Sequence, residues 1–139
     1  MTPDQITLVQ DSFAKVEPIA DQAGKIFYDR LFEIAPNVQL YFSGDIGAQG
    51  MKLMTTLGVV VKGLSNLDSV IPVAEHLAVK HLEYGVKPED YHPVGAALLY
   101  TLKTGLGDAF DAETEAAWTT AYTTLSGVMI KAAYPAAAE

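Results

Sequence analysis

The sequence has no cysteine, which excludes disulfide bonds, thiolate nucleophiles, iron–sulfur clusters and cysteine-ligated zinc. Positive charge is also scarce, because nine lysine and arginine residues stand against 17 aspartate and glutamate residues, a net charge of −8. Such a chain has no basic surface for nucleic acid and would be repelled by an anionic membrane. No apolar run approaches the roughly 18 residues of a membrane span, and the first residues do not resemble a secretory signal. We expect a cytoplasmic protein that binds neither nucleic acid nor membrane.

The length and apolar content favour one folded domain. With 139 residues, half of them hydrophobic and 19% charged, the chain is large enough to bury a core and has an ordinary globular composition. Apolar residues recur with helical spacing nearly throughout, and no segment alternates as a strand does. We therefore expect an all-α domain over residues 1–139, with a frayed tail at about residues 134–139.

Caps and helix-breaking residues set the expected boundaries. Thr2 and Gln5 form a capping-box pattern before the first helix, and Asp111 or Asp108 can cap the last one. The expected helices run from Thr2 towards Pro18, over Ala20–Ile34, briefly to Phe42, over Gln49–Leu64 and Asp68–His81, then through a fifth segment ending near "GLGDAF", and finally from "DAETEAAW" onward.

One of the three histidines differs from the other two. The helical spacing places His81 on one face with three apolar residues, Val70, Ala74 and Leu77, whereas His76 shares a face with Lys80 and Glu83, and His92 precedes Pro93. An inward histidine is either a hydrogen-bonded core residue or a metal ligand. No second histidine or close carboxylate cluster supplies a zinc-type site. A metal held by His81 alone must therefore bring its other ligands with it, as the iron of haem does.

Two further polar residues are predicted to face inward. Gln49 heads an apolar stripe that continues through Leu53, Leu57, Val60 and Leu64, and Tyr28 shares a face with Gly24, Leu31 and Ala35. Gln49 can alternatively face solvent at a helix start, and the Tyr28 hydroxyl can simply find a carbonyl in the core. Gly24 and Gly50 lie beside these two residues, where missing side chains would let two helices cross closely.

At this point the chain resembles a globin, specifically a bacterial single-domain haemoglobin similar to the haem domain of flavohaemoglobins. The resemblance covers residues 4–133 and rests on "IFYDRLFEIAPNVQLYF", "QGMKLM", "VKHLEYGVKPEDYHPVG" and "AWTTAYTTLSGVMI", in this order. The distance of 32 residues from Gln49 to His81 (81 − 49) also fits the family's spacing. The resemblance implies a three-over-three helical sandwich around one haem b, an iron protoporphyrin.

The resemblance also implies roles for individual residues. His81 matches the proximal iron ligand, and Tyr28 and Gln49 match the distal pair that donates hydrogen bonds to bound oxygen. The implied cofactor-binding residues are Phe42, Leu53, Leu57, Leu77, Tyr91 and Val94, together with Lys52 and Lys80 if either reaches a propionate. For each lysine the alternative is an ordinary solvated side chain.

Two departures from flavohaemoglobins affect the expected chemistry. No flavin or nicotinamide domain follows, so we expect electrons to come from a separate flavin reductase. The glutamate that completes a hydrogen-bonded set with the proximal histidine and the tyrosine matched by Tyr91 is missing, since its place falls near Pro135 and the only nearby glutamate is Glu139. This weakens the expectation of peroxidase-like chemistry at His81.

Three functions remain open from the sequence. The first is reversible binding of oxygen, or of another small diatomic ligand, in an oxygen carrier. The second is a nitric oxide dioxygenase that detoxifies nitric oxide to nitrate with an external reductase. The third is a gas sensor or a haem-free interaction module. We expect a monomer or a weak homodimer.

Overall fold

The computed structural model describes residues 1–42, 45–83 and 86–133, and over these ranges it is helical without any strand. Its six α-helices are α1 (Pro3–Val16), α2 (Ala20–Ile34), α3 (Ile46–Lys62), α4 (Leu67–Glu83), α5 (Tyr91–Leu106) and α6 (Ala112–Ala133). Short 3₁₀ helices join them, namely η1 (Glu17–Ile19), η2 (Pro36–Tyr41), η3 (Gly63–Ser65), η4 (Pro88–Asp90) and η5 (Gly107–Ala109). The all-α prediction is confirmed. The predicted frayed tail lies outside the described residues.

Side-chain caps fix two helix starts as the sequence predicts. The Thr2 hydroxyl accepts a hydrogen bond from the Gln5 N–H at 3.2 Å, and the Gln5 side chain accepts one from the Thr2 N–H at 3.0 Å. At α6, Asp111 is the capping residue, because its carboxylate accepts a 2.8 Å hydrogen bond from the Thr114 N–H. This hydrogen bond holds the pKa of Asp111 below its ordinary value, since it favours the charged form.

The predicted start of α3 at Gln49 is wrong by three residues. The helix begins at Ile46 because Asp45 caps it, with a carboxylate oxygen 2.9 Å from the Gly47 N–H. Gln49 therefore lies within the first turn, and its N–H donates to the Asp45 carbonyl at 3.1 Å. The short segment before Phe42 forms the 3₁₀ helix η2, and Phe42 itself is extended.

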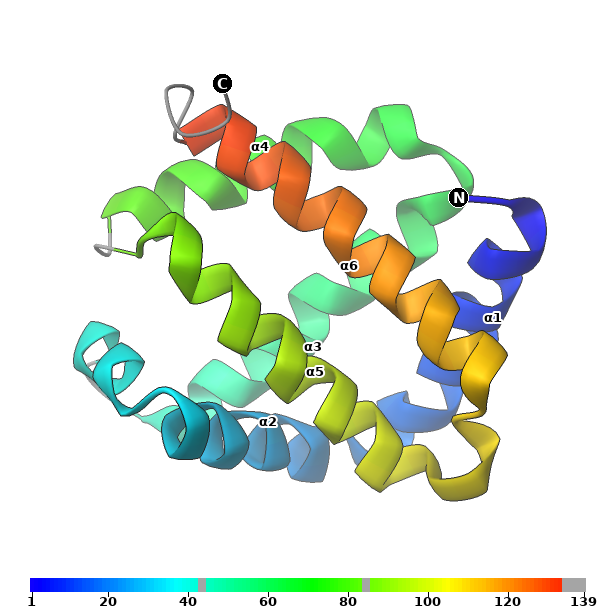
Figure 1. Cartoon of the computed structure of the whole chain (residues 1–139), viewed down its shortest axis with the longest axis horizontal. Helices are drawn as coiled ribbons and strands as arrows, with labels where there is room; N and C mark the ends of the chain where they lie inside the picture. Colours follow the sequence, from blue (N-terminus) through cyan, green and yellow to red (C-terminus); the bar gives the residue numbers. More distant parts are fainter. Residues whose placement is uncertain (43–44, 84–85, 134–139) are drawn as a thin grey trace.

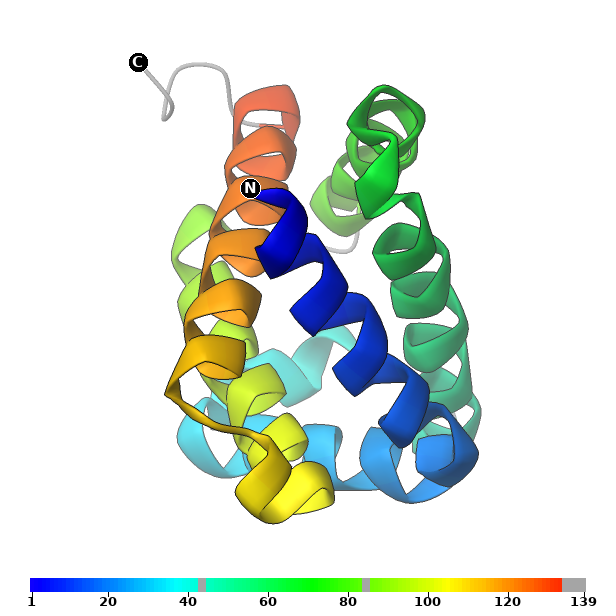
Figure 2. The same cartoon turned by 90° about the vertical axis from the view of Figure 1, so that its right-hand side faces the viewer.

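The helices form two groups that share α6. Helix α2 packs against α3 and α5, whereas α4 packs mainly against α6. Figures 1 and 2 place α4 and α2 at opposite ends of the molecule, and Figure 2 shows α1 between α6 and α3. None of the described helices has both the length and the apolar character needed to cross a membrane.

The crossing of α2 and α3 depends on two glycines, as predicted. A Cβ atom on Gly24 would lie 2.8 Å from the Gly50 Cα, and a Cβ on Gly50 would lie 3.2 Å from the Gly24 Cα. Both distances are shorter than ordinary contacts, so the two backbones meet where neither residue has a side chain.

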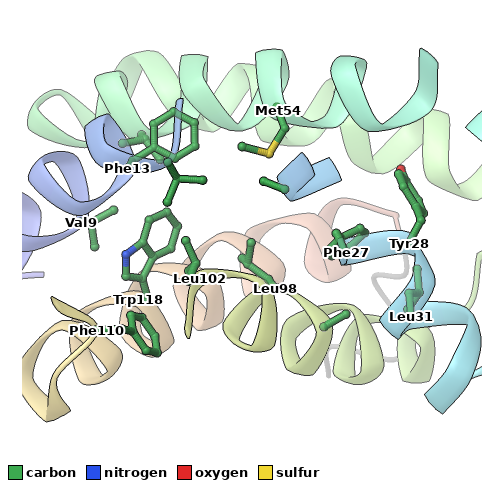
Figure 3. Packing of buried hydrophobic residues seen from close by; sticks show 14 of the residues in the cluster. Val9, Phe13, Phe27, Tyr28, Leu31, Met54, Leu98, Leu102, Phe110 and Trp118 are labelled. Carbon is green, nitrogen blue, oxygen red and sulfur yellow. The ribbon is translucent and has the colours of Figure 1, made fainter. Parts of the chain in front are cut away.

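The buried apolar residues form two clusters. The larger one joins α1, α2, α3, α5 and α6, and Figure 3 shows its packing from Trp118 and Phe13 at one end to Phe27 and Tyr28 at the other. Trp118 is 2% exposed, and its indole N–H donates to the Ser12 hydroxyl at 2.8 Å. The smaller cluster joins α4 to α6 and to the start of α5.

Candidate functional site

His81 lies in the last turn of α4 on the face that the sequence predicts to be internal. Val70 and Ala74 on this face are buried, Leu77 and His81 are half-buried, and His76 and His92 are exposed. The His81 Nδ1 lies 2.6 Å from the Leu77 carbonyl oxygen. A carbonyl only accepts hydrogen bonds, so Nδ1 carries the proton and the lone pair of the neutral ring is on Nε2. This tautomer is the one required for metal ligation through Nε2.

Tyr91 lies beside His81 at the start of α5. The two ring centroids are 6.3 Å apart and the rings are inclined by 30°. Tyr91 is held from α6, because the Tyr122 hydroxyl donates a hydrogen bond to the Tyr91 carbonyl. Gly95 makes room for this contact, since a Cβ at that position would lie 2.7 Å from the Tyr122 ring. The place of the missing glutamate, near Pro135, lies outside the described residues.

Tyr28 lies in α2 within a group of aromatic rings. Its ring centroid is 5.0 Å from that of Phe27, 5.8 Å from that of Phe32 and 5.2 Å from that of Phe42. The side chain is 6% exposed, and burial raises the pKa of Tyr28 to about 12, so the hydroxyl stays protonated and can donate. Figure 3 shows this hydroxyl directed away from the α2 backbone, on the side towards α3.

The Tyr28 hydroxyl makes no hydrogen bond with the described residues, and although its ring is buried, the hydroxyl is not one of their fully buried polar atoms. In particular, no hydrogen bond joins it to Gln49, which is half-buried in the first turn of α3. The sequence-based alternative, a core phenol bonded to a carbonyl, finds no support in this part of the chain.

The predicted apolar residues are half-buried although they adjoin the core. Phe42, Leu53, Leu57 and Val94 pack against the larger cluster, whereas Leu77 packs against the smaller one. The candidate site thus takes residues from both clusters, with Tyr28 in the first and His81 next to Tyr91 in the second. A flat apolar group ligated by one histidine fits this set, because it would cover half-buried aliphatic side chains and face a protonated phenol.

The two lysines stand apart from this set. Lys52 and Lys80 are both exposed, and the Lys80 ammonium lies 3.9 Å from the Glu83 carboxylate. Their predicted contact with a propionate stays a prediction. Among the described residues, no three histidine, aspartate or glutamate side chains come together as a metal site.

An apolar cavity of about 70 Å³ lies elsewhere, between α3, α4 and α6. Val60 and Leu64 line both this cavity and a smaller one of about 20 Å³, which extends to Leu57 and Leu98. Neither cavity is lined by His81 or Tyr28. Both are far too small for a porphyrin and belong to the core packing.

Sequence reasoning missed Tyr41 and Asp90. The Tyr41 hydroxyl donates a 2.7 Å hydrogen bond to the Asp90 carboxylate, which is 6% exposed. The available signal in the sequence was the acidic residue just before Tyr91. In the structure Asp90 occupies the N-cap position of α5, but its side chain accepts from the Lys87 N–H at the start of η4 and does not cap α5. Tyr122 was also missed, and Gly95 one turn after Tyr91 was the corresponding signal.

Comparisons with known proteins relate the chain to one family. The globin family model matches residues 25–129. A flavohemoprotein of Vibrio cholerae is 30% identical over 133 residues, covering 94% of this chain and 34% of the relative. A flavohemoprotein of Oceanobacillus iheyensis is 33% identical over 109 residues, covering 76% and 27%, and one of Bordetella parapertussis is 29% identical over 144 residues, covering 99% and 36%. The chain spans about a third of the length of these relatives.

Proposed function

The chain belongs to the globin family, and on this premise we propose that it binds haem b through His81 and takes up oxygen reversibly beside Tyr28. When bound, haem b supplies a ferrous iron that binds oxygen or another diatomic ligand. The role of His81 is supported by its tautomer, because the Leu77 carbonyl holds the proton on Nδ1 and keeps the lone pair on Nε2.

The Tyr28 side chain, which is 6% exposed and carries a hydroxyl without a protein partner among the described residues, is the observation that carries this proposal. Its pKa of about 12 keeps it a hydrogen-bond donor at neutral pH, and it makes no hydrogen bond with the described residues. A phenol donor would retain longer any diatomic ligand that gains partial negative charge on binding. Gln49 is the second proposed donor, because its amide lies half-buried in the first turn of α3.

Two measurements on the purified protein test this proposal. Titration with haem should give one equivalent of binding and a Soret band, and His81→Ala should lose most of the affinity. Tyr28→Phe should speed oxygen dissociation by about tenfold or more, the effect of losing one strong hydrogen bond. The matched control is Tyr100→Phe, an exposed tyrosine on α5. An unchanged off-rate in Tyr28→Phe would refute the role of the phenol, and the absence of haem binding would favour an interaction module.

The second candidate function is oxidation of nitric oxide. The similarity to flavohemoproteins favours it, because the name of these relatives joins haem with a flavin. In this reaction one nitric oxide, one oxygen and one electron give one nitrate, and a separate flavin reductase supplies the electron. Tyr28 and Gln49 would orient the oxygen. Repeated nitrate formation with a flavin reductase and a nicotinamide reductant would support the enzyme, whereas a single oxidation per haem would identify a carrier.

A further inference from the structure

Asp90 makes one long-range and two local hydrogen bonds near the candidate site. Its carboxylate accepts hydrogen bonds from the Tyr41 hydroxyl at 2.7 Å and from the Lys87 N–H at 2.9 Å. Its own N–H donates to the Lys87 carbonyl at 3.0 Å, which closes a reciprocal pair within η4. At 6% exposed, Asp90 is one of few buried charged or polar residues in the described chain. A buried carboxylate with two donors forms a specific contact, because loss of either donor leaves charge poorly compensated.

The two segments that this contact joins both carry candidate site residues. Tyr41 ends η2 and immediately precedes Phe42, whose ring lies 5.2 Å from Tyr28 and 5.6 Å from Phe32. Asp90 immediately precedes Tyr91, the neighbour of His81. The Tyr41–Asp90 hydrogen bond therefore ties the segment on the Tyr28 side of the site to the segment on the His81 side.

The link continues to the helix that carries His81. The Val86 N–H donates to the His81 carbonyl at 3.1 Å. The next residue, Lys87, donates its N–H to the Asp90 carboxylate. Residues 86–90 are thus anchored at one end on α4 and at the other on η2.

We propose that Tyr41 and Asp90 form a latch that would help to retain the porphyrin, by holding residues 86–90 against η2. The inference rests on the proposed haem binding through His81. Both residues are positioning residues, since neither is placed in contact with the iron or with a gaseous ligand. Separating these two segments would break the Tyr41–Asp90 hydrogen bond, and this bond would therefore slow any release of the porphyrin that requires the separation.

The test measures the rate at which haem-loaded protein loses its cofactor to an excess of an apo-globin acceptor. Tyr41→Phe removes only the hydroxyl and should speed haem loss by about tenfold, the effect of losing a hydrogen bond to a carboxylate. In an Asp90→Ala background the same substitution should have a smaller effect, because the hydrogen bond to Asp90 is already absent. Tyr100→Phe, the matched exposed control, should lose haem at the wild-type rate.

Several outcomes would overturn the latch. A wild-type rate in Tyr41→Phe refutes it, and so does a Tyr41→Phe effect of equal size in the presence and absence of Asp90. A fall in the urea midpoint of both cofactor-free and haem-loaded protein, with haem loss unchanged, identifies a purely structural hydrogen bond. If Tyr41→Phe fails to fold, Asp90→Asn replaces it, with faster haem loss expected and an unchanged rate refuting the latch. Failure of the wild-type protein to take up haem refutes the proposed function and the latch together, whereas haem uptake with unchanged loss refutes the latch alone.

Discussion

Replacing Gly24 with alanine should destabilise the protein, although alanine is the better helix former. The new Cβ would lie 2.8 Å from the Gly50 Cα and 3.0 Å from the Gly50 carbonyl carbon and oxygen. Ordinary contacts begin at 3.4 Å, so α2 and α3 must separate by several tenths of an ångström. All three contacting atoms belong to the backbone, and no side chain can rotate away.

The expected magnitude is the difference between two effects. Overpacking of this kind costs about 1–3 kcal/mol, and exchanging glycine for alanine inside a helix returns up to about 1 kcal/mol. The contact with three backbone atoms places the cost in the upper part of its range. We therefore expect Gly24→Ala to lower the free energy of unfolding by about 1–2 kcal/mol.

Gly127→Ala is the matched control, because a Cβ on this α6 residue would meet no atom within 4 Å. This variant should gain about 0.5–1 kcal/mol from helix propensity alone. Urea unfolding followed by the fluorescence of Trp118, the single tryptophan, measures both variants on protein of equal haem content. If Gly24→Ala raises the urea midpoint as Gly127→Ala does, the close crossing of α2 and α3 is refuted.

Two further substitutions test individual hydrogen bonds. Ser12→Ala removes the acceptor of the buried Trp118 indole N–H and should cost about 1–3 kcal/mol of stability. The same urea titration measures this loss, and Thr119→Ala, at an exposed position of α6, is the control. A loss no larger than that of the control would contradict the assignment. Asp111→Ala should destabilise α6 at neutral pH. The folded-state pKa of Asp111 is lowered by the Thr114 N–H, so its stabilising effect is present above the unfolded-state pKa and is lost as the pH falls through the folded one. Thermal unfolding from pH 7 to pH 3 should show the wild-type advantage narrowing, and a constant difference would argue against a charged cap.

Local patterns predicted most helices because each pattern acts over a few residues. The capping box at Thr2, the cap at Asp111 and the inward face of α4 all depend on neighbours within one or two turns. The start of α3 was predicted at Gln49, whereas the helix begins at Ile46. The glycines before Gln49 suggested a loop, whereas the Asp45 cap was sufficient to start the helix earlier.

Long-range contacts explain what the sequence could not predict. Tyr41 and Asp90 are 49 positions apart, and Tyr122 and Tyr91 are 31 apart. No periodic pattern connects such residues, since their meeting depends on how η2 and α6 pack against α5. Gly24 and Gly50 were an exception, because two glycines beside inward-facing polar residues indicated a crossing before the helices were placed.

Because α4 packs mainly on α6 and belongs to the smaller cluster, we expect it to open at a lower free energy than the larger cluster. A locally unfolding unit of this kind has an opening free energy below the free energy of global unfolding. Backbone amides of α4 would then exchange their hydrogens with solvent before those of α2 or α3. A cofactor bound to His81 would bridge the two clusters and draw α4 into the cooperative unit. Binding of the cofactor would thus be thermodynamically coupled to the folding of α4.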